Sequence, residues 1–212
     1  MTHLLTRAIQ KLRSNPRYVL EWATAALRGT AYAVFFRLFR RQVRIQLPFL
    51  VSAPVSIQGP GAVFIGRGCA VRWNVFDGLN ITTLSADAKV EIGPRCNLGG
   101  ITIRCKNRVT IGAQAMFANC LVQDTPFWSR SGSHSGRASA EPAVPEGITL
   151  GSQSWLSSQT VALDGCHVGD ESVLSLGAVC CRQRVPSRHV AFGNPVDRFL
   201  SIERIENLLR VT

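Results

Sequence analysis

The stretch ITLGSQ SWLSSQ TVALDG CHVGDE SVLSLG AVCCRQ RVPSRH VAFGNP, residues 148–195 of a 212-residue chain, decides the fold. Its hexads share a third place that is mostly apolar. This column reads Leu150, Leu156, Ala162, Val168, Leu174, Cys180, Pro186 and Phe192. Each hexad fits one short strand and a corner, and three hexads close one triangular turn with the column inside. Because each turn can bury its apolar face only against its neighbours, the repeats predict an all-β solenoid.

The same pattern is looser upstream. VSIQGPGAVFIGRG (55–68), KVEIGPR (89–95) and RVTIGAQ (108–114) keep an aliphatic residue followed by glycine. The solenoid is therefore predicted to span residues 43–198. Residues 124–147 lose the pattern and are rich in Ser, Gly, Pro and Ala, which predicts a loop extruded from a corner.

Helical patterns flank the solenoid. Residues 199–212 are predicted to form a short amphipathic helix that caps the C-terminal end. Residues 1–42 form a basic amphipathic segment, with apolar residues at spacings of three and four over 4–41. Pro16 and Gly29 are expected to break this segment into separate helices.

The N-terminal segment also carries most of the charge. Up to Arg44 the chain has nine Lys and Arg residues against Glu21 alone, which is +8 of the total net charge of +11. Two interpretations stay open: the segment caps the open end of the solenoid, or its apolar and arginine-bearing sides lie on an anionic membrane. The remaining chain is nearly neutral, which argues against a nucleic-acid-binding surface.

The cysteines and the hydropathy of the chain indicate where in the cell the protein is expected. The seven cysteines include no CxxC pair, which indicates small buried thiols in a reducing cytosol. No cluster has the ligand spacing of a metal site. Basic residues interrupt any early apolar run, and no stretch approaches the ~20 residues of a membrane span. We therefore expect a cytoplasmic protein, with peripheral contact to the inner membrane as an option.

The block from Ile148 to Arg198 resembles the hexapeptide-repeat O-acetyltransferases of bacterial polysaccharide biosynthesis. The resemblance rests on ITLGSQ (148–153), WLS (155–157), DG (164–165), HVGDES (167–172), SVLSLGAV (172–179), RVP (184–186) and AFGNPVDR (191–198). It implies a left-handed parallel β-helix that assembles as a homotrimer. It also implies that acetyl-CoA lies in a groove between neighbouring chains and acetylates a hydroxyl of a sugar or lipid-linked saccharide.

The family's general base is a histidine near the start of the extruded loop. On that alignment Trp128 stands at the histidine position in DTPFW (124–128), and an indole cannot accept a proton. His134 lies in the same loop and is the candidate substitute, with Asp124 acting through water as the alternative. The other histidines are expected elsewhere: His3 in the terminus, His167 on the outer surface and His189 in a corner.

The resemblance also implies a cofactor-binding set. Its members are Trp155, Ser157, Ser175, Leu176, Gly177, Arg182, Gly193, Asn194 and Arg198. The family's small pairs along the groove are here Ser157-Ser158 and Ser175-Leu176, and the leucine is expected to narrow the channel. Arginines near the groove, including Arg184, can meet the nucleotide phosphates.

Two functions are consistent with these residues. One is acetyl transfer from acetyl-CoA to a sugar hydroxyl. The other is a catalytically degenerate relative that keeps the trimeric solenoid as an assembly or regulatory module at the membrane. A γ-type carbonic anhydrase would need three metal-binding histidines, and a sugar nucleotidyltransferase would need a further nucleotide-binding domain.

Overall fold

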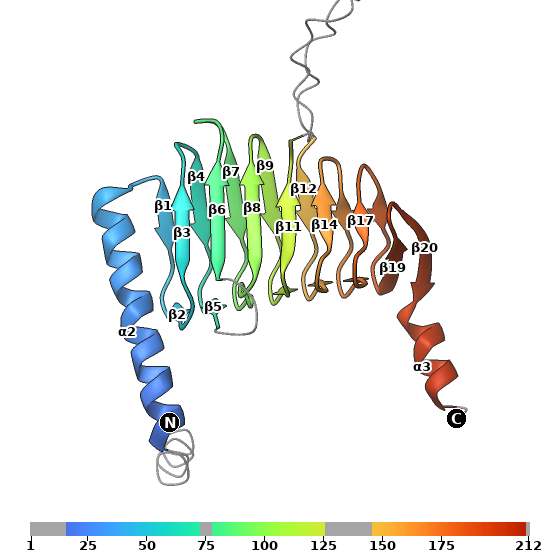
Figure 1. Ribbon diagram of the computed structural model, residues 1–212, viewed down its shortest axis with the longest axis horizontal. Coiled ribbons are helices and arrows are strands. Elements are labelled where there is room, and N and C mark those ends of the chain that lie inside the picture. Colours follow the sequence, from blue (N-terminus) through green and yellow to red (C-terminus); the bar gives the residue numbers. More distant parts are fainter. Residues whose placement is uncertain (1–15, 73–77, 126–145, 211–212) are drawn as a thin grey trace, which may run out of the picture.

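The computed structural model describes residues 16–72, 78–125 and 146–210. Figure 1 shows a helix, α2 (Pro16–Phe39), at one end of a parallel β-solenoid and a short helix, α3 (Ile202–Arg210), at the other. In that view the near strands run upward, the far strands run downward and the coil advances to the right, so the coil is left-handed. The predicted fold class is confirmed.

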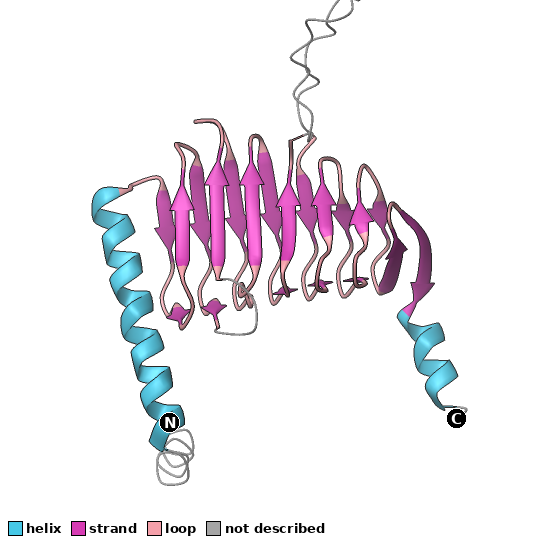
Figure 2. Ribbon diagram, viewed as in Figure 1, coloured by secondary structure: helices cyan, strands magenta, loops and turns pink. Residues whose placement is uncertain are grey.

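Three faces form the coil (Figure 2). Face 1 is a seven-stranded sheet. Its strands are β1 (Val43–Ile45), β4 (Ala62–Ile65), β7 (Lys89–Ile92), β9 (Arg108–Ile111), β12 (Ile148–Leu150), β15 (His167–Val168) and β18 (Arg184–Val185). Face 3 is a six-stranded sheet. Its strands are β3 (Val55–Gln58), β6 (Leu79–Thr83), β8 (Ile101–Cys105), β11 (Cys120–Gln123), β14 (Val161–Leu163) and β17 (Val179–Cys180).

Face 2 joins face 1 to face 3. Its strands are β2 (Leu50–Val51), β5 (Ala70–Val71), β10 (Met116–Phe117), β13 (Trp155–Leu156), β16 (Val173–Leu174), β19 (His189–Gly193) and β20 (Val196–Ser201). They have two residues each except for the last two, β19 and β20, which are longer. Single bridges from Ala70 to Asn97 and from Asn97 to Met116 connect its two parts. The chain passes from face 1 to face 2 to face 3 in each turn, so every turn has three corners.

The coil narrows along the chain. On face 3 the paired residues Ile57 and Ile81 are 24 positions apart, whereas Ala162 and Cys180 are 18 apart. Eighteen residues are three hexads, so the strict repeat is visible in the sequence only where the coil has reached this size. The wider turns keep the inward column, which includes the fully buried Ile81.

The predicted apolar column holds from Leu150 to Cys180, all of it buried. The last two assignments were wrong, because the buried residues are Val185 and Ala191 rather than Pro186 and Phe192. Five positions separate Cys180 from Val185, one fewer than separate Ala162 from Val168. The corner after β17 is therefore one residue shorter, which shifts the register by one.

Both ends of the coil are covered. The expected helix at 199–212 begins later, at Ile202, because residues 196–201 form β20. This strand runs antiparallel to β19, with Ala191 opposite Phe199. It thereby hides the last strand edge of face 2.

At the N-terminal end, α2 packs against β1 and β2 and buries Ala25, Ala33 and Phe36. The predicted break at Gly29 was wrong: the helix runs through it. Gly29 lies against the backbone of Phe49, where a side chain would not fit. Glycine here serves close packing between the helix and the coil rather than a helix end.

Candidate functional site

The corner between faces 2 and 3 carries most of the predicted cofactor-binding residues. Ser157 and Ser158 form it in one turn, and Ser175, Leu176 and Gly177 form it in the next. The two turns are held in register, since the Ser157 N–H donates to the Leu174 carbonyl at 3.1 Å and the Gly177 N–H donates to the Ser158 carbonyl at 3.1 Å. Successive turns are therefore stacked about 4.8 Å apart along a straight edge.

Two amides on this edge are available to a ligand. Within residues 146–210, the N–H groups of Ser158 and Leu176, each at the apex of its corner, donate no hydrogen bond. Gly177 adopts a positive φ of 70°, and a Cβ built on it meets nothing within 4 Å. The edge thus offers two backbone donors in successive turns beside open space.

Leu176 projects from the same edge. Its side chain is 70% exposed, although leucine is usually covered. The positive φ at Gly177 ends the turn directly after it, and the small Ser175 precedes it. The side chain therefore stands outside the core, where it can restrict access to the edge.

Trp155 lies next to this corner on the outer surface of face 2. It pairs with Met116 on one side and Val173 on the other, and all three side chains point outward. Trp155 and Met116 are about half exposed. The row forms an apolar strip that continues directly into the corner of Ser157.

Gly193, Asn194 and Arg198 lie in the β19–β20 hairpin that follows. Gly193 has a φ of 113° and sits close to the Pro195 carbonyl and the Asp197 carboxylate, so it permits the tight turn. Asn194 is exposed at the tip, and Arg198 is exposed on β20 opposite Phe192. The hairpin stacks on the turn that contains Ser175, whose N–H donates to the Ala191 carbonyl at 3.0 Å.

Arg182 lies at a different corner, between faces 3 and 1. Its guanidinium is 3.8 Å from the Asp164 carboxylate, and its amide donates to the Asp164 carbonyl. It reaches this corner because it follows β17 by two residues. Within one chain, the structure therefore separates Arg182 from the other predicted cofactor-binding residues. The segment that the sequence predicts as the extruded loop lies in the chain between β11 and β12, the strands on either side of the corner between faces 3 and 1.

Asp124 is fully buried where that loop begins. Its Oδ1 accepts the Lys106 N–H at 2.6 Å, and its Oδ2 accepts the Asn107 N–H at 2.7 Å. The Cys105 thiol donates to Oδ2 at 3.4 Å. Burial, together with this carboxylate, raises the pKa of Cys105 to about 12. With both oxygens engaged, Asp124 holds the turn after β8 and is not placed to activate a water.

His134 and Trp128, the other predicted catalytic positions, lie outside the described residues. Two histidines lie within the described residues, His167 on face 1 and His189 at the start of β19 on face 2. His167 is half-buried on β15, opposite Thr149 and Arg184. The His189 Nδ1 is 2.8 Å from the Ser187 carbonyl.

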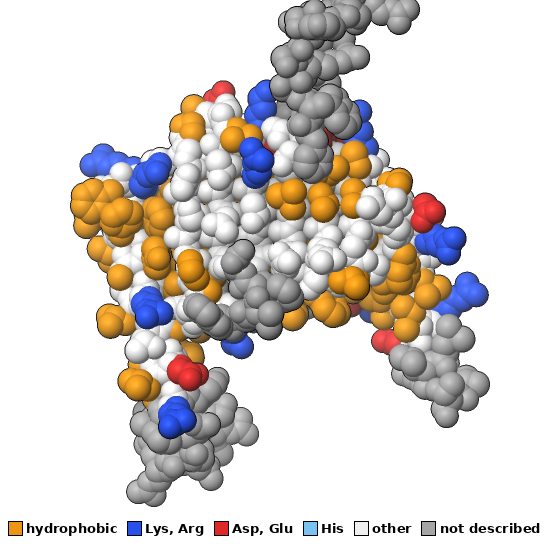
Figure 3. Space-filling view, viewed as in Figure 1, with side chains coloured by type: hydrophobic (Ala, Val, Ile, Leu, Met, Phe, Trp, Pro, Cys, Tyr) orange, Lys and Arg blue, Asp and Glu red, His pale blue; other side chains and the backbone are white. Residues whose placement is uncertain are grey.

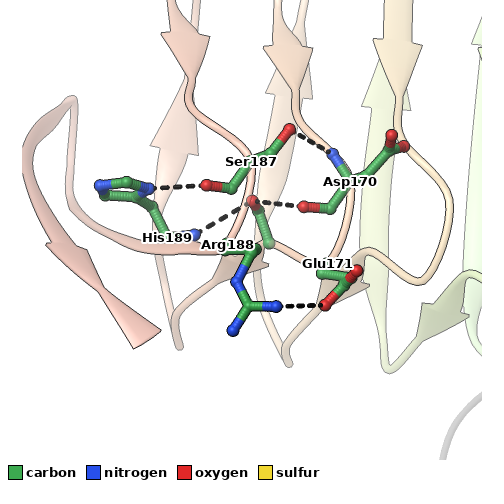
Figure 4. A network of polar contacts seen from close by, with 6 residues as sticks. Asp170, Glu171, Ser187, Arg188 and His189 are labelled. Carbon is green, nitrogen blue, oxygen red and sulfur yellow. Dashed lines mark hydrogen bonds and ion pairs between the residues drawn. The ribbon is translucent and has the colours of Figure 1, made fainter. Parts of the chain in front are cut away.

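The corner between faces 1 and 2 holds a polar network with a structural role (Figure 4). The Ser172 hydroxyl donates to the Pro186 carbonyl at 2.7 Å and accepts the His189 N–H at 3.2 Å. Nearby, Arg188 pairs with Glu171 at 3.3 Å, and both residues have positive φ. Because these groups satisfy one another, the network joins successive turns rather than waiting for a ligand.

Asn119 belongs to the candidate edge but was missed from the sequence. It has a φ of 48°, and its carbonyl accepts the Gln159 N–H at 2.8 Å. It therefore extends the corner of Ser157 by one turn. Asn119 directly precedes Cys120, as Gln159 directly precedes Thr160, and this equivalence could have identified it. The looser repeats upstream of residue 124 obscured the equivalence.

Three further properties bear on the site. Among the described residues, no three His, Cys, Asp or Glu side chains gather as a metal site would require. Across the same ranges, no helix is both long and apolar enough to cross a membrane. Six of the seven cysteines are buried free thiols, and Cys181 is exposed.

No family model matches the sequence, and no curated protein matches it. A crystal structure from Bacillus cereus, described as that of a "putative acetyltransferase", is similar over 80% of this chain and 84% of its own, with 18% identity and a TM-score of 0.44. At this level the likeness says nothing about the reaction or the substrate of this chain.

Proposed function

We propose that the protein is an acetyltransferase that moves the acetyl group of acetyl-CoA to a sugar hydroxyl of a bacterial surface polysaccharide or its lipid-linked precursor. The observation that carries this proposal is the edge with the free amides of Ser158 and Leu176. The sequence motifs around it, from ITLGSQ to AFGNPVDR, support the same assignment by their resemblance to hexapeptide-repeat acetyltransferases.

The edge suits the pantetheine arm of acetyl-CoA, which is extended and carries two amide carbonyls. Donors in successive turns, about 4.8 Å apart, can meet such carbonyls without any side chain. Trp155 and Met116 offer apolar surface beside them, and Arg198 is an exposed cation at the hairpin that can contact phosphate. Gly193 and Asn194 form the turn that would lie against the nucleotide end.

The reaction needs a base for the acceptor hydroxyl. The base removes the hydroxyl proton, the oxygen attacks the thioester carbonyl, and coenzyme A leaves as a thiolate that takes up a proton. We propose His134 as this base, since Asp124 is committed to backbone amides and Trp128 has no basic nitrogen. A backbone N–H beside the thioester would stabilise the oxyanion.

A homotrimer completes this proposal. In a single chain, Arg182 lies at the corner between faces 3 and 1, and the predicted loop follows β11 on face 3. Ser158 and Leu176 lie at a different corner, between faces 2 and 3. A neighbouring solenoid would bring one chain's loop to the other chain's edge. We expect a mass in solution of about three times 23.1 kDa.

The test is acetyl transfer measured as release of the coenzyme A thiol in the presence of sugar acceptors. The His134→Ala variant should lose activity by about 10²–10⁴-fold. His167→Ala, on the outer surface of β15, is the matched control and should retain it. Equal activity of the two variants would exclude His134 as the base.

The second candidate is a trimeric assembly or regulatory module at the membrane without catalysis. Two observations favour it: Trp128 at the family's histidine position, and the exposed Leu176 on the edge. A trimer that neither binds nor turns over acetyl-CoA would support this alternative.

A further inference from the structure

Helix α2 presents a second apolar side, away from the coil. Its inner side is formed by Ala25, Gly29, Ala33 and Phe36, which pack on the solenoid. Residues two positions apart on a helix point about 200° apart, so Leu27 faces away from Gly29. A helix that only capped the coil would be polar there, and this one is not.

The outward side carries a regular apolar row, here named the outer stripe. It consists of Leu20, Leu27, Ala31, Val34 and Leu38. Their spacings of seven, four, three and four residues place them on one face of the helix. Its three leucines are each at least 66% exposed. Trp22, Phe35 and Phe39 are also exposed along the helix. Such a contiguous apolar surface marks an interaction site.

The charge beside the stripe is mainly positive. Arg17, Arg28 and Arg37 are exposed on α2, against the single acidic residue Glu21. Figure 3 shows Lys and Arg side chains interspersed with hydrophobic side chains over the part of the surface that α2 forms. Arg28 also borders a shallow hollow lined by Ala31, Tyr32 and Phe35. Apolar residues with arginines at their margins fit a surface that is apolar inside and anionic outside.

We propose that the outer stripe lies in the interface of an anionic membrane, with α2 parallel to the surface and the solenoid standing on it. The helix crosses the end of the coil (Figure 1), so its outward side faces along the coil axis. Pairing of α2 with α2 of a second copy is disfavoured, since it would bring the flanking arginines together. An anionic lipid surface accepts both the leucines and the arginines.

This placement sets the height of the candidate site. From β1 to β12 there are four strand steps on face 1, and the step is about 4.8 Å. The edge of Ser158 and Leu176 would then stand roughly 20–25 Å above the end of the coil that carries α2. This consequence rests on the proposed function: the acceptor hydroxyl would belong to a lipid-anchored saccharide at some distance from its lipid.

Cosedimentation of the full chain with vesicles tests the proposal, using phosphatidylcholine alone and phosphatidylcholine mixed with anionic phosphatidylglycerol. The wild type should bind the anionic vesicles, more weakly as salt is raised. Leu27→Gln with Leu38→Gln should lower the affinity on the order of a hundredfold. Arg28→Gln with Arg37→Gln should lower it on the order of tenfold and reduce its salt dependence.

The matched control is Leu84→Gln with Arg204→Gln, which changes the same residue types at exposed positions outside α2. It should bind as the wild type does, and thermal unfolding should show that all variants fold. Failure of the wild type to bind, or full binding by the leucine variant, would overturn the proposal. A leucine variant that changes the mass in solution but not vesicle binding would assign the stripe to a second copy. Acetyl-CoA is absent from these assays, so they are independent of the proposed reaction.

Discussion

Gly29 lies so close to Phe49 that a Cβ on the glycine would stand 1.7 Å from the Phe49 carbonyl oxygen. This contact fixes α2 against β2 and explains why a glycine occurs inside a continuous helix. The helix hides the first strand edges of the coil and keeps Phe36 buried. Helix α2 is therefore part of the folded unit, and its outward side is free for another role.

Replacement of Gly29 by alanine should destabilise the protein, although alanine favours helices by about 1 kcal/mol. The added methyl group meets backbone that cannot turn aside, so α2 must shift, at a cost of about 2 kcal/mol or more. Urea unfolding measures the change. Ala31→Gly, exposed in the same helix, is the control and should lose only the propensity of about 1 kcal/mol. A Gly29→Ala protein as stable as the wild type would contradict the close packing.

Asp124→Asn should be costly for stability even though the shape is conserved. One carboxylate oxygen becomes an NH₂ group that faces a backbone N–H, so a buried charge-assisted hydrogen bond is lost. We expect a loss of about 3 kcal/mol in the free energy of unfolding. Asp87→Asn, at an exposed position, should change it by less than about 0.5 kcal/mol. Similar values for the two variants would mean that Asp124 does not hold the turn.

Leu176→Ala should strengthen acetyl-CoA binding. The side chain is exposed, so its removal should leave the thermal unfolding midpoint almost unchanged. It should open the edge beside the Ser158 and Leu176 amides and raise affinity on the order of tenfold, which is about 1.4 kcal/mol. Titration calorimetry of the two proteins compares them directly. Weaker binding by the variant would show that the leucine contacts the ligand rather than obstructs it.

Alkaline pH should weaken the fold through buried thiols. Burial raises the pKa of Cys120 to about 12, against an ordinary value of 9.0. Above pH 9 the unfolded chain loses this proton while the folded chain keeps it, so stability is full below pH 9 and falls as pH approaches 12.

The thiol's contribution to that fall is at most ~1.4 kcal/mol per pH unit. Cys120→Ala should therefore show a shallower decline in urea-unfolding experiments carried out from pH 8 to about 11. The slope is compared within each protein, so any constant cost of the substitution cancels. Parallel slopes would show that the Cys120 proton is not linked to folding.

The sequence predicts the solenoid well because each six-residue repeat corresponds to one strand and one corner of the coil. Between Leu150 and Cys180 each turn has 18 residues, which is three hexads. Residues 18 positions apart therefore occupy equivalent places in successive turns. Where turns are wider, as between Ile57 and Ile81, a residue's place in a six-residue repeat no longer predicts whether it lies in a strand or at a corner. The one-residue shift before Val185 escaped detection because Pro186 and Phe192 still resemble column residues.

The ends and the site were harder to predict. Gly29 reads locally as a helix end, and only the tertiary contact with Phe49 reveals its role. Ser157 and Ser175 were assigned to the cofactor-binding set because they stand where the resembled family has small residues along its groove, and the structure places them at one corner in successive turns. Arg182 was grouped with them as an arginine able to meet the nucleotide phosphates, whereas within one chain it lies at another corner, beside Asp164. Asp124 resembled a candidate base, but its partners lie 17 and 18 residues earlier, in the preceding turn.

The central claim is that the edge of Ser158 and Leu176 binds acetyl-CoA, and calorimetric titration of the purified full chain tests it most directly. We predict saturable binding in the micromolar range, about −8 kcal/mol at 1 μM. Absence of binding at millimolar acetyl-CoA would contradict the claim and leave the solenoid as an assembly module.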